Sequence, residues 1–369
     1  MTDERGLIGP KHKHESLPVT ASLVKRLPKS DLHSHIDGSV PAEELFAIAK
    51  NHGRKVTSSS GRVLRSPGDL ANHVRGSGFH HMLEDIVSRF YPIVGLMQTE
   101  QILRDVGLAY VKELKDHNVA YAEGRFAPQY HTREGLTHRQ AILSVAEGLE
   151  EGSERYGVQT NLIVAIGREA SPETGNDVAR AAVGSGKVVA LDLSGAEELI
   201  PLEKFSEAFR IGTKAGLKRT VHAGEGAGSL VQNLTNIRTA IEVLGAQRVG
   251  HAIDISKDPA LVRVALERRV ALEMNPVSNL VLYKIRDFRE LGIDGLLASG
   301  VWVTLNSDDP ALWPRGSIDD VLARVCRSYG FGLSELDTLI TNSFKCSFAS
   351  ERVKEGLLED YARARRRAA

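Results

Sequence analysis

The chain has 369 residues, of which 42% are hydrophobic and 25% are charged, so it can bury a sizeable core. This composition excludes an intrinsically disordered chain, a collagen and a coiled coil. The 47 basic and 47 acidic residues balance, which argues against nucleic-acid binding and favours a small neutral or weakly charged ligand. Two cysteines, Cys326 and Cys346, cannot build a disulfide framework, and no apolar run is long enough for a signal peptide or a membrane span. We therefore expect a cytoplasmic protein that does not bind membranes.

An N-terminal arm over residues 1–28 shows no strand pattern, and short β-branched runs then alternate with longer amphipathic stretches. Eight strands are expected, over 29–33, 120–126, 160–166, 188–193, 219–222, 248–251, 270–274 and 302–306. Three helix starts are indicated: Ser39 before Pro41, the capping box from Thr137 to Gln140, and Ser171 before Pro172. Eight strand–helix units predict a (β/α)8 TIM-type barrel over residues 29–369, although an open doubly wound sheet has the same alternation.

Two segments add to the barrel pattern. Residues 53–95 form a lid-like insertion, in which 53–78 is rich in Ser, Gly and Arg and 79–94 predicts a helix. Residues 317–369 predict helices packed outside the barrel, with the terminal RARRR as a solvated helix end.

Four groups of polar residues stand at the predicted carboxyl ends of strands. His33 and His35 are two positions apart, so both side chains point to the same side of a strand. The same spacing in His12 and His14 falls in the charged arm and does not indicate a site. The other groups are His222 with Glu225 in VHAGEG, His251 in VGHAID, and Asp308 with Asp309 in NSDDP. Each group alone could be structural, as a turn or a core histidine.

These groups follow the first, fifth, sixth and eighth predicted strands, and barrel enzymes place their active sites at that face. Three histidines and an aspartate suit Zn²⁺ or a similar divalent ion, without any thiolate. Because such an ion makes hydroxide available at neutral pH, a hydrolytic reaction is expected.

At these residues the chain resembles the adenosine deaminase family of metal-dependent purine deaminases, in the amidohydrolase superfamily. The resemblance runs from about residue 30 to 350 through eight blocks in order: SDLHSHIDGSV, YAEGRFAPQ, VALDLSGAEE, TVHAGEGAG, RVGHAIDI, MNPVSN, NSDDP and NSFKCSF. It implies one zinc ion per chain, held by His33, His35, His222 and Asp308, and a hydroxide on that ion that attacks C6 of adenosine or 2′-deoxyadenosine.

The resemblance also implies roles for the remaining residues. Glu225 would protonate N1 of the purine, and His251 would orient and deprotonate the water. Asp309 would bond N7 and help to position the water. His35, Asp37, Gly195 and Asp309 would bind the substrate, with Gly195 meeting N3 and Asp37 the ribose 5′-hydroxyl.

The chain departs from the family pattern at Ala252, usually glycine, and at Asn275, often cysteine, and we expect neither to touch a ligand of the metal. Asp37 favours a nucleoside, since adenine deaminases of this type carry glutamate there. Deamination of adenine, aminodeoxyfutalosine or N6-methyl-AMP stays open, because arginines in the insertion could serve an anionic substrate; they are Arg54, Arg62, Arg65 and Arg75.

The sequence gives less support to two other classes of function, a nucleotide-binding protein and an inactive binding protein. The sequences GEGAG from Gly224 and GSGK from Gly184 lack the spacing of dinucleotide and phosphate loops. A catalytically inactive nucleoside-binding protein is the remaining alternative, and the oligomeric state is not indicated.

Overall fold

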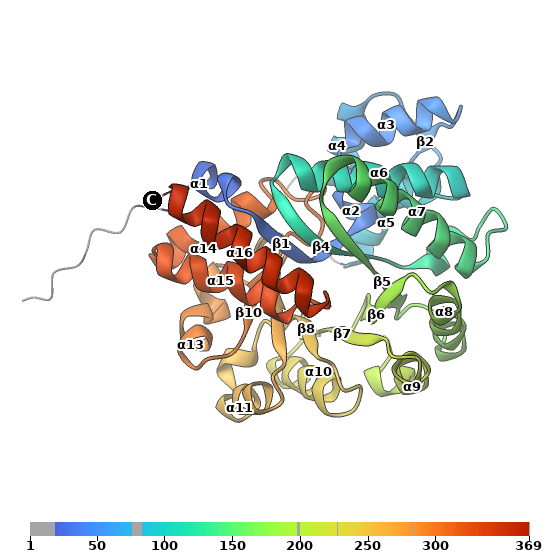
Figure 1. The fold of residues 1–369 in the computed structure, drawn as a ribbon. Coiled ribbons are helices and arrows are strands. Elements are labelled where there is room, and N and C mark those ends of the chain that lie inside the picture. The colour runs from blue at the N-terminus through green and yellow to red at the C-terminus, as the bar shows by residue number, and fades with distance from the viewer. Residues whose placement is uncertain (1–18, 76–82, 198–199, 227, 283, 369) are drawn as a thin grey trace, which may run out of the picture.

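Eight parallel strands form the centre of the fold (Figure 1). The structure is a computed structural model that describes residues 19–75, 83–197, 200–226, 228–282 and 284–368. The strands are β1 Lys29–His35, β4 Val119–Phe126, β5 Gln159–Gly167, β6 Val188–Ser194, β7 Lys218–Ala223, β8 Arg248–His251, β9 Ala271–Met274 and β10 Val303–Leu305. They pair in chain order, and a bridge between Ser34 and Asp308 joins the last strand region to the first. The predicted barrel is confirmed, and the open doubly wound sheet is excluded because its strand order would not be sequential.

Helices surround this barrel and carry most of the chain between the strands (Figure 1). They are α1 Ala21–Arg26, α2 Ile36–Ser39, α3 Ala42–Asn51, α4 Pro67–Arg75, α5 Leu83–Leu96, α6 Glu100–Asp116, α7 His138–Tyr156, α8 Pro172–Ser185, α9 Ser206–Lys214, α10 Leu230–Glu242, α11 Pro259–Glu267, α12 Pro276–Val281, α13 Ile293–Ala298, α14 Ile318–Tyr329, α15 Leu333–Cys346 and α16 Glu351–Ala368. Short 3-10 helices cover Pro128–His131, Leu202–Phe205, Ile255–Lys257 and Phe288–Leu291.

Two of the three predicted helix starts are confirmed. Thr137 caps α7 with both halves of a capping box, and Ser171 caps α8 by accepting from the Thr174 amide. At the third, a helix does begin after Pro41, at Ala42, but the prediction that Ser39 starts it was wrong. Ser39 is the last residue of the short helix α2, and its hydroxyl donates to the His35 carbonyl. Sequence pattern missed α2, since four residues are too few to show a helical period.

The insertion after α3 contains a small hairpin that the sequence did not predict, formed by β2 Val56–Thr57 and β3 Val63–Leu64, followed by α4. The start of the helix predicted over 79–94 lies outside the described residues, and the described part is α5. Most of the N-terminal arm, including His12 and His14, also lies outside them, whereas α1 contacts α14 and α16.

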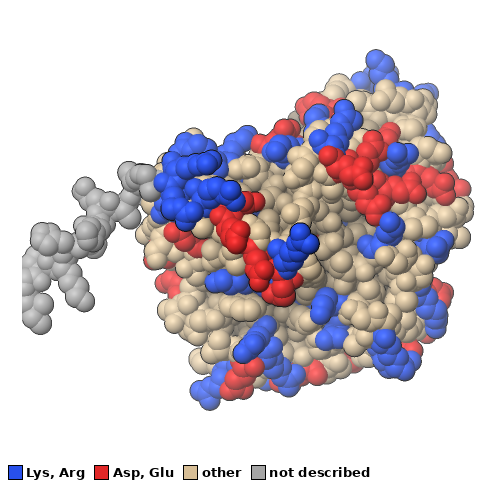
Figure 2. Space-filling model, viewed as in Figure 1, with Lys and Arg blue, Asp and Glu red and all other residues tan. Residues whose placement is uncertain are grey.

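The helical prediction for the C-terminal part is confirmed by α14, α15 and α16, which bury both cysteines. Figure 2 shows basic residues gathered at the free end of α16, whose last turn carries Arg365, Arg366 and Arg367. Among the described helices, none is long and apolar enough to cross a bilayer.

Candidate active site

The four proposed metal ligands meet at the carboxyl end of the barrel, where β1 comes next to the segment after β10. The Asp308 amide donates to the His33 carbonyl (3.0 Å), and the His35 amide donates to the Asp308 carbonyl (2.8 Å). These bonds close the barrel and bring Asp308 beside both histidines. His222 lies near the end of β7.

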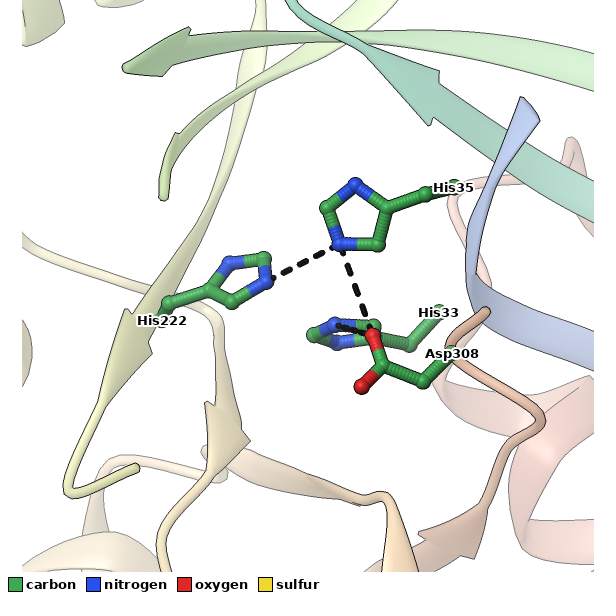
Figure 3. A group of neighbouring side chains, drawn as sticks. All are labelled: His33, His35, His222 and Asp308. Atoms are coloured by element: carbon green, nitrogen blue, oxygen red, sulfur yellow. Dashed lines mark hydrogen bonds and ion pairs between the residues drawn. The ribbon is translucent and has the colours of Figure 1, made fainter. Parts of the chain in front are cut away.

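One ligand atom from each of these four residues lies within 4.8 Å of the others (Figure 3). Nε2 of His35 is 3.2 Å from Nε2 of His222 and 3.5 Å from Oδ1 of Asp308. Nε2 of His33 is 3.4 Å from the same carboxylate oxygen. The side chains therefore converge on a common point rather than on separate partners.

The hydrogen bonds behind this cluster fit a cation at its centre. Nδ1 of His33 contacts Glu273 (2.8 Å), and Nδ1 of His222 contacts Asp192 (3.0 Å), so in each neutral ring Nε2 carries the inward lone pair. His33 Nε2 makes no hydrogen bond to any described residue, although it is fully buried. Inward lone pairs and a carboxylate repel one another, and a divalent cation turns that repulsion into coordination.

A buried charge network holds these outer carboxylates in place. Arg125 contacts Asp192 (2.8 Å) and Glu273 (3.0 Å), and Arg248 contacts Glu273 (2.5 Å). Burial alone would raise the pKa of Asp192, but its contacts with His222 and with the Arg125 guanidinium hold that pKa well below its usual range. Sequence reasoning missed this network, although charges inside apolar strands such as YAEGRF were a signal for it.

His251 is buried next to the cluster and is held from two sides. Its Nδ1 lies 2.9 Å from the Asn279 amide, and its Nε2 lies 3.2 Å from the Asn275 amide and 3.7 Å from Glu225. The family departure Asn275 therefore touches a proposed acid–base residue rather than a metal ligand. Both His251 and Ala252 have positive φ, 64° and 47°, a strained conformation that re-aims the chain at the end of β8.

Glu225 projects from a turn that Glu197 fixes. The two oxygens of Glu197 accept from the Glu225 amide (2.6 Å), the Gly224 amide (3.0 Å) and the Asn236 side chain (2.5 Å). Glu197 was present in the quoted block VALDLSGAEE, but its partners are distant in sequence and could not be inferred from it.

Beside the cluster lies a cavity of about 330 Å³. Its walls include His35, His222 and Asp308 and also four further predicted site residues, which are Asp37, Gly195, Glu225 and Asp309. Of the insertion's arginines, Arg54, Arg62 and Arg65 are exposed away from these walls, Arg54 in an ion pair with Glu134. The side chain of Arg75 lies outside the described residues.

Two wall carboxyls are buried and lack hydrogen bonds at one oxygen. Oδ1 of Asp37 and Oδ1 of Asp309 have no partner among the described residues. Burial raises the pKa of Asp37 to about 6. Burial and the charges of Asp308, Asp37 and Glu225 raise the pKa of Asp309 well above its usual range.

A (β/α)8 barrel with a His/Asp cluster at the carboxyl ends of its strands has the architecture of a metal-dependent hydrolase. The family model described as adenosine deaminase matches residues 28–364. An adenosine deaminase of Clostridium perfringens is 31% identical, covering 90% of this chain and 97% of the relative. An adenine deaminase of Wolinella succinogenes is 30% identical, covering 92% of this chain and 98% of the relative. Among solved structures, adenine deaminase from Arthrobacter aurescens matches with a TM-score of 0.81 and 29% identity, over 91% of this chain and 98% of that one.

The chain therefore belongs to the adenosine deaminase family. It is a metal-dependent hydrolase that acts on the C–N bond of a cyclic amidine, within the class of purine deaminases.

Proposed function

We propose that this protein is a zinc-dependent adenosine deaminase that hydrolyses adenosine or 2′-deoxyadenosine to the inosine nucleoside and ammonia. The observation that carries this proposal is one cavity bordered both by the four-residue metal cluster and by Glu225, Asp309 and Asp37. Its volume, about 330 Å³, falls in the range of roughly 300–1,000 Å³ of small-molecule sites.

Zinc would be held by His33, His35, His222 and Asp308. Three imidazoles with one carboxylate and no thiolate suit zinc, and each ring is available as a neutral ligand when its Nδ1 donates outward. When bound, zinc lowers the pKa of a water to about 7 and so supplies the nucleophile at neutral pH.

The protein's own residues would handle the protons. As C6 becomes tetrahedral, the purine ring needs a proton at N1, and the Glu225 carboxyl supplies it. His251 takes the proton of the attacking water, held in orientation by Asn275 and Asn279. N7 is an acceptor, so its bond to Asp309 requires that carboxyl to carry a proton, and the Gly195 amide donates to N3.

Asp37 favours a nucleoside over free adenine. A buried carboxyl oxygen without a partner is costly, and the 5′-hydroxyl of a ribose would supply the missing donor to Oδ1. The relatives include both adenosine and adenine deaminases, so this residue is what selects adenosine in our proposal.

The test is ultraviolet monitoring of zinc-loaded protein with adenosine, 2′-deoxyadenosine, adenine and AMP. We expect rapid conversion of adenosine to inosine. A Glu225→Gln variant should keep its zinc and lose at least about a hundredfold in kcat, the usual scale for a general acid. Near-normal turnover in that variant would contradict the role of Glu225, and silence of the zinc-loaded wild type on all four compounds would contradict the function itself.

A further inference from the structure

Glu169 borders the cavity but has no role in the proposed chemistry. It follows β5 by two residues, and its carboxylate is held by two fixed donors. The Ala196 amide donates to Oε1 (3.1 Å), and the Tyr130 hydroxyl donates to Oε2. Tyr130 belongs to the 3-10 helix after β4, and Ala196 follows β6. The carboxylate thus ties together the loops after three consecutive strands.

Two glycines leave the space that this pair of side chains occupies. A Cβ atom on Gly167 would lie 2.0 Å from the Tyr130 hydroxyl, and one on Gly195 would lie 2.4 Å from Oε1 of Glu169. Gly195 also has φ +95°, which L side chains rarely adopt. The backbone is therefore shaped around the Tyr130–Glu169 pair, and the carboxylate lies directly against Gly195.

The contact with Gly195 locates Glu169 relative to the substrate. In the proposed function the Gly195 amide meets N3 of the purine, so the carboxylate beside it faces the N3 edge. In an anti ribonucleoside, the 2′-hydroxyl lies on the N3 side of the base. A carboxylate there has acceptor capacity left after two bonds and can take the hydroxyl hydrogen.

The charges of the cavity favour the same class of ligand. The described residues that line it contribute five carboxyl groups, which are Asp37, Glu169, Glu225, Asp308 and Asp309. Against them stands one guanidinium, Arg133, whose Cζ lies 5.0 Å from the ring centroid of Tyr91. In the proposed function zinc offsets the charge of Asp308, and Glu225 and Asp309 carry protons. The carboxylates of Asp37 and Glu169 are therefore the ones that would repel a 5′-phosphate.

We propose that Glu169 is a specificity-determining residue that accepts a hydrogen bond from the 2′-hydroxyl and selects an uncharged ribonucleoside over a deoxyribonucleoside or a nucleotide. This inference rests on the proposed adenosine deaminase function. It adds a preference that the metal cluster and the acid–base residues cannot supply, because they contact only the purine and the water.

The test compares kcat/KM for adenosine, 2′-deoxyadenosine, adenine and AMP in zinc-loaded wild type, Glu169→Ala and Glu169→Gln. Wild type should prefer adenosine over 2′-deoxyadenosine by about tenfold to a hundredfold, the range for a hydrogen bond to a charged group. In Glu169→Ala this ratio should fall to within about threefold of one, through a loss with adenosine and none with 2′-deoxyadenosine. In both variants the rate with AMP relative to adenosine should rise. Glu134→Gln is the matched control, because Glu134 pairs with Arg54 outside the cavity.

Equal use of both nucleosides by wild type, or an unchanged ratio in Glu169→Ala, would overturn the inference. Activity on adenine alone would also overturn it while leaving hydrolytic deamination intact. No activity on any of the four compounds would overturn the proposed deaminase function as well. Failure of the inference about Glu169 can therefore be told apart from failure of the proposed function. Tyr130→Phe gives a second measurement: it removes one donor from Glu169 and should shift the nucleoside ratio in the same direction by a smaller factor.

Discussion

Asp309 occupies space that only a glycine at position 38 leaves open. A Cβ atom on Gly38 would lie 1.8 Å from Oδ1 of Asp309, far inside van der Waals contact. We predict that Gly38→Ala displaces Asp309 and lowers kcat at least tenfold, while zinc content stays at the wild-type level. Gly184→Ala is the control, because a Cβ there, at a helical position in α8, meets no atom within 4 Å. Wild-type kcat in Gly38→Ala would argue against a catalytic role for Asp309.

Asp308 has two roles: its backbone bonds to β1, and its side chain belongs to the candidate metal cluster. Its peptide groups close the barrel, and its φ of +61° is one that asparagine tolerates about as well as aspartate. We predict that Asp308→Asn keeps the closed fold and weakens zinc binding at least tenfold, since loss of even an outer partner of a ligand costs 10- to 100-fold.

Equilibrium dialysis against a zinc buffer measures this effect, with circular dichroism as the check on the fold. Asp309→Asn is the matched control and should bind zinc normally. Full zinc affinity in Asp308→Asn would remove this residue from the proposed ligand set.

At the scale of elements, the turn after β7 depends on one carboxylate from the loop after β6. Glu197 accepts from the amides of Gly224 and Glu225 and from Asn236. Glutamine has a single acceptor oxygen and cannot satisfy all three donors. We predict that Glu197→Gln lowers kcat about tenfold or more, with little change in KM or zinc content, because it moves the proton donor rather than the metal.

The exposed neighbour Glu203 offers a control on the same loop, and Glu203→Gln should behave as wild type. If Glu197→Gln lost zinc as well as activity, the Glu197 carboxylate would support the metal cluster at the carboxyl end of the barrel and not only the turn after β7.

The same scale shows what the sequence could and could not predict. Strand runs such as 160–166, which holds four β-branched residues, were predicted to within one residue at each end, because such runs between turns are local signals. The hairpin of β2 and β3 has two-residue strands and therefore no period to detect. The helix start at Ser39 failed because the hydroxyl found a nearer acceptor at His35. A local signal therefore fails where the element is too short to show a period, or where another nearby backbone group takes the side chain's hydrogen bond.

At the scale of the whole molecule, the convergence of the candidate site residues could be predicted, because their strands end at one face of the barrel. The contacts that hold them were not predicted, since Glu273, Arg125 and Asp192 come from different strands and their pairing depends on closure. The candidate ligands stand at strand ends that can be recognised along the sequence. The buried charges that hold them depend on which strands lie side by side in the closed barrel.

A cluster of three charged side chains, Lys29, Asp319 and His117, joins the start of β1 to the helices α6 and α14. We expect this cluster to make the free energy of unfolding depend on pH. Lys29 lies 3.0 Å from Asp319, at the start of α14, and Asp319 lies 2.7 Å from His117, which ends α6. The hydrogen bonds to Asp319 and Glu113 raise the pKa of His117 to about 9.

Because the unfolded histidine has a pKa of about 6.5, the stabilisation from His117 is fully present below that pH and is lost as the pH rises through 9. We predict that the free energy of unfolding of the wild type falls between pH 6.5 and 9 by on the order of 2–3 kcal/mol more than that of His117→Gln. Urea unfolding of both zinc-loaded proteins at pH 6, 7.5 and 9 would measure the difference. Parallel curves for the two proteins would show that the link between β1, α6 and α14 does not depend on the charge of His117.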